Sequence, residues 1–252
     1  GRLIGMHIFI INLERAAERR ETILGHLRGL GLEAEILPAI EGARMPPGSL
    51  PQGTHPGLSP GEIGCYLSHV RFWETVVARR LPHAIVLEDD VLCSPSLMRV
   101  ATETAALGLP LDALRLSALR PIRGLPIATL SGGERLILPT KNPSGTQGYM
   151  VSLAGARRLL AALSVPRCPI DTALDAYWKH GLRVPLVSPS VVVEDASIAS
   201  TISGRFGTHR SNRFVQHIAR VAQSQRRKLT VFLMARQLRR QMGSPAGGNG
   251  AE

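Results

Sequence analysis

Two apolar runs separated by a helix with a strong start signal limit the folds open to this chain. Met6–Leu13 is apolar at almost every position, and His83–Leu87 is a second apolar run. Strands of this kind are typical of sheets that are covered on both faces. Between the two runs, Ser59 and Glu62 form the Ser-x-x-Glu pattern of a capping box, which predicts a helix that extends to about Arg80. This strand–helix–strand order favours an open α/β sheet, whose ligands bind beyond the carboxyl ends of the strands.

The alternation of strands and helices continues, so we expect one α/β domain over residues 6–204, with a mostly parallel, Rossmann-type sheet flanked by helices. Residues 41–57 are rich in Pro and Gly and are predicted to form a long loop of the kind that is often functional. Leu182–Val193 alternates Pro, Ser and β-branched residues, which predicts edge strands and loop rather than a central strand. The other expected elements are helices at 16–30, 96–107, 152–163 and 171–180 and strands at 35–38, 113–119, 135–138 and 149–152.

The net charge of +11 is concentrated near the carboxyl end of the chain. Ten Lys or Arg and no Asp or Glu lie between Arg205 and Arg240, whereas the first 204 residues carry 20 basic and 18 acidic residues. The apolar residues of this segment form two clusters at helical spacing: Phe214, Ile218 and Val221, and then Leu229, Phe232 and Leu233.

These two features predict a basic amphipathic helical tail over residues 205–242 that lies on an anionic membrane surface. Residues 243–252 are predicted to be disordered. A solvated helix or a partner-binding tail is the alternative. Charge alone also permits nucleic acid, which we do not expect as a partner.

The cysteines and the apolar segments bear on the compartment. Cys65, Cys93 and Cys168 are odd in number, widely separated and without C-x-x-C spacing, which indicates neither a disulfide framework nor a zinc site. The apolar stretch at 6–13 lacks the long hydrophobic region and the cleavage site of a signal peptide. No run approaches the roughly 18 apolar residues of a membrane span. We therefore expect a cytoplasmic protein that is peripheral on the inner face of a membrane.

Three consecutive acids, Glu88, Asp89 and Asp90, follow directly on the apolar run that ends at Leu87. Adjacent ionised carboxylates at the end of a buried strand repel one another unless a cation neutralises them. Carboxylate oxygens suit Mn²⁺ or Mg²⁺, which commonly take one or two protein carboxylates together with phosphate and water. Because alternate strand residues share a face, Glu88 and Asp90 are expected on one side and Asp89 on the other. A solvated acidic turn is the alternative.

Five ordered groups of residues carry a resemblance to a known family. They are Ile10–Leu13 with Arg19 and Arg20; Gly61–His69; Ile85–Val91; Gly145–Tyr149 with Ser152, Gly155 and Ala156; and Pro169–Asp171. In this order and spacing they resemble glycosyltransferase family 25, the bacterial lipopolysaccharide and lipooligosaccharide galactosyltransferases that are related to the collagen galactosyltransferases. The resemblance extends from residue 6 to about residue 203. It implies a GT-A-like α/β fold, an inverting mechanism and a UDP-sugar donor.

The same resemblance assigns roles around the donor. The acidic triplet stands where the GT-A fold carries its Asp-x-Asp motif, with Glu88 in place of the first Asp. Asp90, with Glu88, is expected to hold Mn²⁺ or Mg²⁺. The residues expected to contact the donor are Asn12, Arg20, His69, Glu88 and Asp89. A solvated face for Arg20 and a hydrogen-bonded structural role for His69 are the alternatives.

The acceptor side needs a base that takes the proton of the attacking hydroxyl. Asp171 matches an acidic position of the family and is the first candidate; Asp175, one turn later, is the second. The alternative for Asp171 is the N-cap of a helix. Gln147 and Tyr149 belong to a Gly-rich segment and are expected to contact the acceptor, because a Tyr ring can pack on the apolar face of a sugar. A core position is the alternative for Tyr149.

The expected function is therefore metal-dependent transfer of a hexose, galactose from UDP-galactose, to a lipopolysaccharide, lipooligosaccharide or other surface glycan or glycolipid. A nucleotidyltransferase also uses a carboxylate-bound metal at an α/β strand end and is the second enzyme class. A non-enzymatic basic module that binds membrane or nucleic acid is the third possibility. The sugar, acceptor and hydroxyl depend on the shape of the pocket, which no motif encodes.

Overall fold

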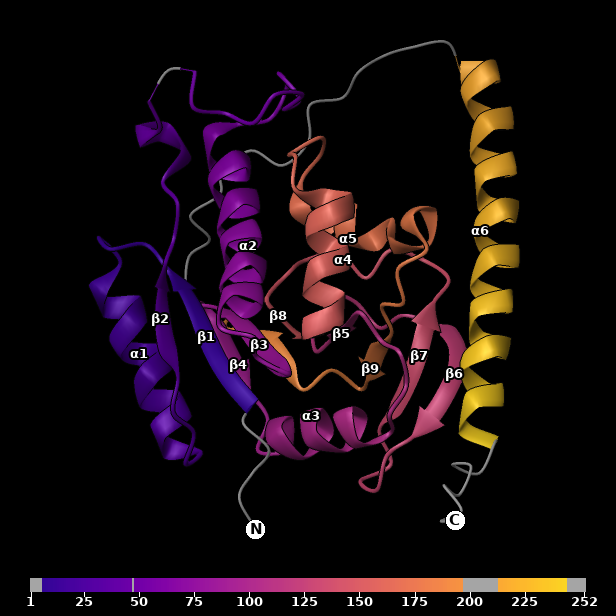
Figure 1. Cartoon of the computed structure of the whole chain (residues 1–252), viewed down its shortest axis with the longest axis horizontal. Helices are drawn as coiled ribbons and strands as arrows, with labels where there is room; N and C mark the ends of the chain where they lie inside the picture. Colours follow the sequence, from indigo (N-terminus) through magenta and orange to yellow (C-terminus); the bar gives the residue numbers. More distant parts are fainter. Residues whose placement is uncertain (1–5, 47, 197–212, 244–252) are drawn as a thin grey trace, which may run out of the picture.

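The computed structural model describes residues 6–46, 48–196 and 213–243. Its centre is an eight-stranded sheet in the order β2-β1-β3-β8-β5-β9-β7-β6, and β4 and β10 form a separate antiparallel pair (Figure 1). The strands are β1 (Met6–Asn12), β2 (Glu35–Pro38), β3 (His83–Glu88), β4 (Val91–Cys93), β5 (Ala113–Arg115), β6 (Gly124–Thr129), β7 (Arg135–Pro139), β8 (Gly148–Ser152), β9 (Leu186–Ser188) and β10 (Val192–Glu194). The helices are α1 (Ala17–Gly29), α2 (Pro60–Ala78), α3 (Leu97–Ala106), α4 (Leu153–Leu163), α5 (Ile170–Asp175) and α6 (Arg213–Gly243), with short 3-10 helices η1 (Gly42–Arg44) and η2 (Tyr177–His180).

The central sheet is mixed in strand direction. β1 pairs in parallel with β2 and with β3, and β5 pairs in parallel with β9. The pairs β3–β8, β5–β8, β7–β9 and β6–β7 are antiparallel. The α/β class and the flanking helices are thus confirmed, and the expected parallel arrangement holds among the N-terminal strands. After β1 the chain adds β2 on one side and β3 on the other, which creates a topological switch point between the carboxyl ends of β1 and β3.

Strand β9 lies inside the sheet, between β5 and β7. The prediction that residues 182–193 form only edge strands and loop is therefore wrong for this segment. Only three residues, Leu186–Ser188, belong to the strand, and Pro185 and Pro189 flank it. Neither proline has to donate a hydrogen bond within the ladder, so a central position is compatible with both. β10 pairs only with β4, outside the main sheet.

Two helices begin where their capping residues predict. The Ser59 hydroxyl accepts a hydrogen bond from the Glu62 backbone N at 3.3 Å, and the Glu62 carboxylate accepts one from the Ser59 backbone N at 2.8 Å. Ser152 caps α4 by accepting from the Gly155 backbone N at 2.9 Å. A Cβ atom at Gly155 would lie 1.8 Å from the Asp112 carbonyl oxygen, so only glycine permits this close approach. α2 and α4 pack side by side, and α2 also contacts β1 and β3 (Figure 1).

The long C-terminal helix α6 packs against the edge of the sheet. It lies beside β6 (Figure 1) and buries Val231, Ala235 and Leu238 in the common hydrophobic core. The expected tail is therefore helical in its described part, but one of its faces belongs to the fold. No helix in the described ranges contains a stretch long and apolar enough to cross a bilayer.

Some predictions about the tail cannot be compared with the structure. The predicted disordered end, residues 243–252, begins one residue too early, because Gly243 is the last residue of α6. Residues 244–252 lie outside the described residues, as do 197–212. The side chains of the first apolar cluster of the tail, Phe214, Ile218 and Val221, also lie outside the described part of the chain. The predicted boundary between residues 204 and 205 falls in the same undescribed range.

Candidate functional site

The acidic triplet stands at the carboxyl end of β3, beside the end of β1. β3 ends at Glu88 and the next two residues form a bend, so the alternation of faces expected for a strand does not extend through the triplet. The Asn12 side-chain amide, at the end of β1, donates to Asp89 Oδ2 at 2.7 Å. Arg19 of α1 pairs with Asp89 and also with Asp90, the latter at 3.2 Å. Asn12 and Arg19 therefore position the triplet from two different elements.

Asp90 is surrounded by more negative charge than its arginine partner offsets. Burial, followed by the neighbouring Glu88 carboxylate, raises the pKa of Asp90 from 3.8 to about 6, although Arg19 acts in the opposite direction. Glu194, at the end of β10, adds another carboxylate to this environment. Asp90 Oδ1 is buried and has no hydrogen-bond partner. A divalent cation would stabilise such an arrangement, because hard cations bind carboxylate oxygens and neutralise their repulsion.

A cavity of about 240 Å³ opens at this switch point between β1 and β3. The acidic triplet, Gln147 and Glu194 line it together with Arg15 and Arg19. The long loop that the sequence marks as functional contributes residues 41–43 to the wall. Carboxylates next to guanidinium groups suit a ligand that combines phosphate groups with a metal ion.

The wall formed by the loop is held against α2 by close backbone packing. A Cβ atom at Gly42 would lie 1.9 Å from the Pro60 carbonyl oxygen, and one at Gly64 would lie 2.4 Å from the Ile40 carbonyl oxygen. Ser68 reinforces the contact: its hydroxyl donates to the Gly64 carbonyl at 2.7 Å and accepts from the Ile40 backbone N at 2.8 Å. Gly42 and Gly64 therefore set the distance between α2 and the cavity wall.

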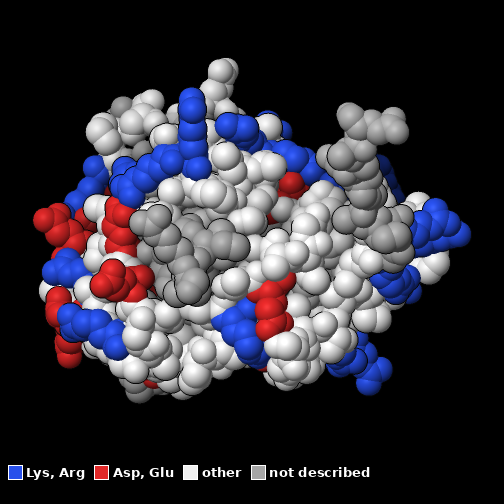
Figure 2. Space-filling view, turned by 60° about the horizontal axis from the view of Figure 1, so that its bottom comes forward, with Lys and Arg blue, Asp and Glu red and all other residues white. Residues whose placement is uncertain are grey.

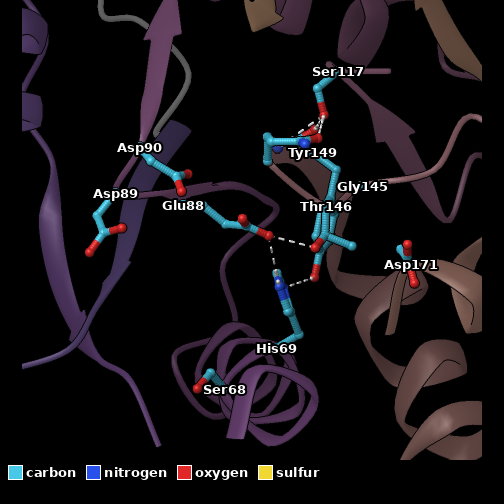
Figure 3. Close-up of polar contacts among 12 residues, drawn as sticks. Ser68, His69, Glu88, Asp89, Asp90, Ser117, Gly145, Thr146, Tyr149 and Asp171 are labelled. Atoms are coloured by element: carbon cyan, nitrogen blue, oxygen red, sulfur yellow. Dashed lines mark hydrogen bonds and ion pairs between the residues drawn. The ribbon is translucent and has the colours of Figure 1, made fainter. Parts of the chain in front are cut away.

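Glu88 faces a chain of hydrogen bonds that begins in the core (Figure 3). Thr146 Oγ1 donates to Glu88 Oε1 at 2.5 Å, and His69 Nε2 lies 3.9 Å from the same oxygen. His69 Nδ1 contacts the Tyr149 hydroxyl at 2.9 Å, and Trp73 Nε1 donates to that hydroxyl at 2.9 Å. Because an indole N–H can only donate, the hydroxyl accepts from Trp73, and its own hydrogen is available for His69 Nδ1. In the neutral imidazole the remaining hydrogen is then on Nε2, on the side of Glu88.

Cys65, His69 and Glu88 offer one sulfur, one nitrogen and one oxygen atom within 4.8 Å of one another. Such a ligand set suits zinc. Zinc binding would require His69 Nε2 without its hydrogen, whereas the hydrogen bond from the Tyr149 hydroxyl to Nδ1 favours the opposite tautomer. The geometry therefore favours the tautomer with the hydrogen on Nε2, although at 3.9 Å from Glu88 Oε1 this buried nitrogen makes no hydrogen bond with the described residues.

The two candidate bases both lie on α5, at a distance from the triplet in the sequence. Figure 3 shows Asp171 on the far side of the segment that carries Thr146. Asp171 is half-buried and accepts from the Thr172 backbone N at 2.7 Å, but the N-cap position is occupied by Pro169, so the N-cap alternative for Asp171 is wrong. Asp171 as the base stays a prediction.

Asp175 is held in a buried ion pair. Its side chain is 3% exposed and lies 2.8 Å from the guanidinium of Arg115, which is also 3% exposed. The Ser144 backbone N donates to the same carboxylate at 3.1 Å. Burial raises the pKa of Asp175, and Arg115 opposes that rise. A carboxylate with these partners has no access to a substrate hydroxyl, so the structure argues against Asp175 as the base.

Of the other residues predicted to contact donor or acceptor, some line the cavity and others do not. Gln147 lines the cavity. Tyr149 is 1% exposed and hydrogen-bonded in the core, so the prediction that its ring packs on a sugar is wrong and the core alternative is correct. Arg19 contacts the acids and lines the cavity, whereas Arg20 is not part of the cavity wall. Side chains on neighbouring helical positions point in different directions, which explains why only one of the two arginines reaches the site.

Glu194 is a cavity residue that the sequence analysis did not single out. It follows the apolar run Val191–Val193, so it repeats the pattern of an apolar strand that ends in an acid. Asp195 continues that pattern, and its backbone N donates to the Asp90 carbonyl oxygen at 2.8 Å. The same signal that marks the triplet would therefore have identified this second acidic strand end.

These features define an α/β protein with an acidic cavity at the carboxyl ends of parallel strands. A family model described as Glycosyltransferase family 25 (LPS biosynthesis protein) matches residues 6–120. The chain is 31% identical over 188 residues to a Glycosyltransferase 25 family member of Anopheles gambiae; the matched region covers 67% of this chain and 31% of that protein. It is 30% identical over 191 residues to the Inactive glycosyltransferase 25 family member 3 of Homo sapiens; the matched region covers 66% of this chain and 31% of that protein.

The chain belongs to glycosyltransferase family 25. It spans about a third of the length of these two relatives. One of these relatives is named as inactive and the other is not, and the chain is about equally similar to both. Family membership is therefore compatible with an active and with an inactive chain.

Proposed function

We propose that this chain is an inverting, metal-dependent glycosyltransferase that transfers a hexose, galactose from UDP-galactose, to a lipopolysaccharide, lipooligosaccharide or other surface glycan or glycolipid. The single observation that carries the proposal is the acidic triplet on the wall of a cavity that Arg15 and Arg19 also line, with Arg19 in direct contact with Asp89 and Asp90. A nucleotide-sugar has a diphosphate, which suits the arginines, and it is commonly bound together with a metal, which suits the carboxylates.

The metal-binding part of the proposal rests on Asp90 and Glu88. The unsatisfied Oδ1 of Asp90 and the raised pKa of this carboxyl group support a cation there. When bound, Mn²⁺ or Mg²⁺ would offset the charge that develops on the departing diphosphate. Arg19 is the residue on this wall that would meet the phosphates, and its present pairing with Asp89 and Asp90 would be exchanged for them.

The transfer itself exchanges one bond for another. The acceptor oxygen forms a bond to the anomeric carbon, the bond from that carbon to the donor phosphate breaks, and UDP departs with the electron pair. The acceptor proton has to pass to a base. We assign it to Asp171 because this residue matches an acidic position of the family, whereas Asp175 is held in its buried ion pair with Arg115. Asp171 is not among the described residues that line the cavity. Gln147, on the cavity wall, is the residue proposed to orient the sugar.

The decisive experiment measures UDP release from UDP-galactose and from other UDP-hexoses with Mn²⁺, with and without a glycan acceptor. We expect release that a chelator abolishes and that Asp90→Asn abolishes as well. The matched control is Glu35→Gln, because Glu35 forms an exposed surface pair with Arg79 outside the cavity lining. Full activity of the chain in the presence of chelator would rule out the metal-dependent mechanism.

The assignment of the base has a separate readout. Asp171→Asn should lower kcat for transfer while the affinity for UDP, measured by calorimetry, stays unchanged, because the base does not contact the donor. Equal losses in UDP affinity and in kcat would place Asp171 in donor binding.

The same incubations separate the other readings. A nucleotidyltransferase would release pyrophosphate from a nucleoside triphosphate, and a non-catalytic member of the family would bind UDP without releasing it from UDP-sugars. The last outcome has to be tested because two relatives, from Mus musculus and Homo sapiens, are named as inactive. UDP binding without turnover on any tested hexose would overturn the catalytic proposal while leaving the cavity assigned to a nucleotide.

A further inference from the structure

The described part of α6 has two different apolar faces. One face, formed by Val231, Ala235 and Leu238, is fully buried against the sheet. Leu229 and Leu233 lie on the opposite face, with Phe232 beside them, at exposed fractions of 61%, 52% and 48% respectively. Large apolar side chains with this exposure gain nothing from the fold, because the helix is already held by its other face.

The exposed face is basic as well as apolar. Arg226, Arg236 and Arg240 are exposed and stand three, seven and eleven positions from Leu229, which places them on the same side of the helix. From residue 205 to residue 240 the sequence contains no Asp or Glu. Figure 2 shows Lys and Arg, and no acidic side chains, at the right-hand edge of the molecule, which is the edge where α6 lies in Figure 1.

The arginines and the exposed apolar side chains together indicate which kind of partner this face binds. A second copy would bring a row of arginines against another row of arginines, which is unfavourable. Nucleic acid would use the arginines, but its phosphates have no use for three exposed apolar side chains. An anionic lipid surface uses both, because leucine and phenylalanine enter the boundary of the acyl chains while arginine meets the headgroups.

We infer that the outer face of α6, formed by Arg226, Leu229, Phe232, Leu233, Arg236 and Arg240, is a docking surface for an anionic lipid bilayer. The inner face fixes the helix on the edge of the sheet, so the bilayer contacts an ordered part of the protein. This differs from a detached tail, since docking would then hold the whole α/β domain in a defined orientation. The inference does not depend on the proposed transferase activity.

The test is co-sedimentation of the full chain with vesicles of phosphatidylglycerol and phosphatidylethanolamine, compared with vesicles of phosphatidylcholine alone. We expect binding to the anionic vesicles that weakens with salt. Replacing Leu229, Phe232 and Leu233 by Gln keeps good helix formers on an exposed face. Each replacement should weaken binding by about fivefold, so the triple variant should lose about a hundredfold.

A second variant and a matched control separate lipid docking from other effects. Replacing Arg226, Arg236 and Arg240 by Gln should weaken binding to anionic vesicles by about fivefold for each charge. Leu92 and Val193, which face each other across β4 and β10 and are exposed 41% and 49%, provide the control: the same apolar-to-Gln change there should leave vesicle binding unchanged. Thermal unfolding by circular dichroism checks that each variant keeps the wild-type fold.

The inference is overturned if the folded apolar triple variant binds anionic vesicles as well as wild type. It is also overturned if wild type binds phosphatidylcholine equally, if it binds duplex DNA or RNA but no vesicles, or if it self-associates through this face and ignores both kinds of vesicle. Loss of vesicle binding in the two α6 variants, with UDP binding retained, supports lipid docking whatever the outcome for catalysis.

Discussion

Replacing Asp90 by Asn should stabilise the folded protein at neutral pH in the absence of a divalent ion. The folded environment raises the pKa of Asp90 from 3.8 to about 6, mainly through burial and the Glu88 carboxylate. A rise of about two pH units, at about 1.4 kcal/mol for each, corresponds to about 3 kcal/mol. Asn has nearly the same shape, can still accept a hydrogen bond from Arg19, and carries no charge to be penalised.

The direction of the pKa shift of Asp90 determines how the stability difference between Asp90→Asn and wild type depends on pH. Between pH 3.8 and about 6 the folded state binds the Asp90 proton more tightly than the unfolded state does. The contribution of this group to stability is therefore most favourable below pH 3.8 and is lost as the pH rises through about 6. The advantage of Asp90→Asn over wild type should accordingly be smallest near pH 4 and reach its full size, at most about 3 kcal/mol, at pH 8.

Urea unfolding in chelator at several pH values measures this difference directly. With Mn²⁺ at about 100 times its Kd, wild type should gain about 2.7 kcal/mol, whereas Asp90→Asn should gain much less. Asp89→Asn is an informative contrast, because Asp89 accepts from Asn12 and pairs with Arg19, so its replacement should lower the free energy of unfolding by about 1–3 kcal/mol. If Asp90→Asn were no more stable than wild type at pH 8, or if the difference did not change with pH, the electrostatic account of the triplet would be refuted.

Three other replacements test the packing around the cavity by the same unfolding assay. Tyr149→Phe should lower the free energy of unfolding by about 1–3 kcal/mol, because the buried Trp73 N–H loses its acceptor; a variant as stable as wild type would contradict the hydrogen-bonded core role. Arg115→Met should lower the free energy of unfolding by about 3–5 kcal/mol, because it leaves the buried Asp175 carboxylate unpaired; adding Asp175→Leu should recover much of that loss. If Arg115→Met were as stable as wild type, the ion pair would have no part in stability. Gly64→Ala should cost about 1–3 kcal/mol and weaken UDP binding measured by calorimetry, because its Cβ atom would displace the cavity wall; unchanged binding would show that this wall does not touch the nucleotide.

Local signals in the sequence were sufficient for most of the elements. The capping box at Ser59, the cap at Ser152 and the apolar run that ends at Glu88 each involve residues close in the chain, and each is confirmed. Helix capping and strand periodicity depend on hydrogen bonds and side-chain directions within a few residues, so a single sequence is enough to read them. The position of the acidic triplet beyond the end of a buried strand was available for the same reason.

The tertiary structure decided which distant side chains meet. Asn12 and Asp89 are 77 positions apart, and His69 and Tyr149 are 80 positions apart, so no local pattern connects them. Tyr149 belongs to the core and Arg19 rather than Arg20 reaches the acids, because packing between α1, α2 and the sheet sets those directions.

The C-terminal helix shows the same division. Its charge, periodicity and apolar residues are plain in the sequence, and these predict a basic amphipathic helix. A helix with apolar residues on two sides can bury either one, and only the edge strand β6 decides that Val231, Ala235 and Leu238 turn inward. Leu229, Phe232 and Leu233 are left outside because burial depends on what a helix packs against, which the helix's own sequence does not contain.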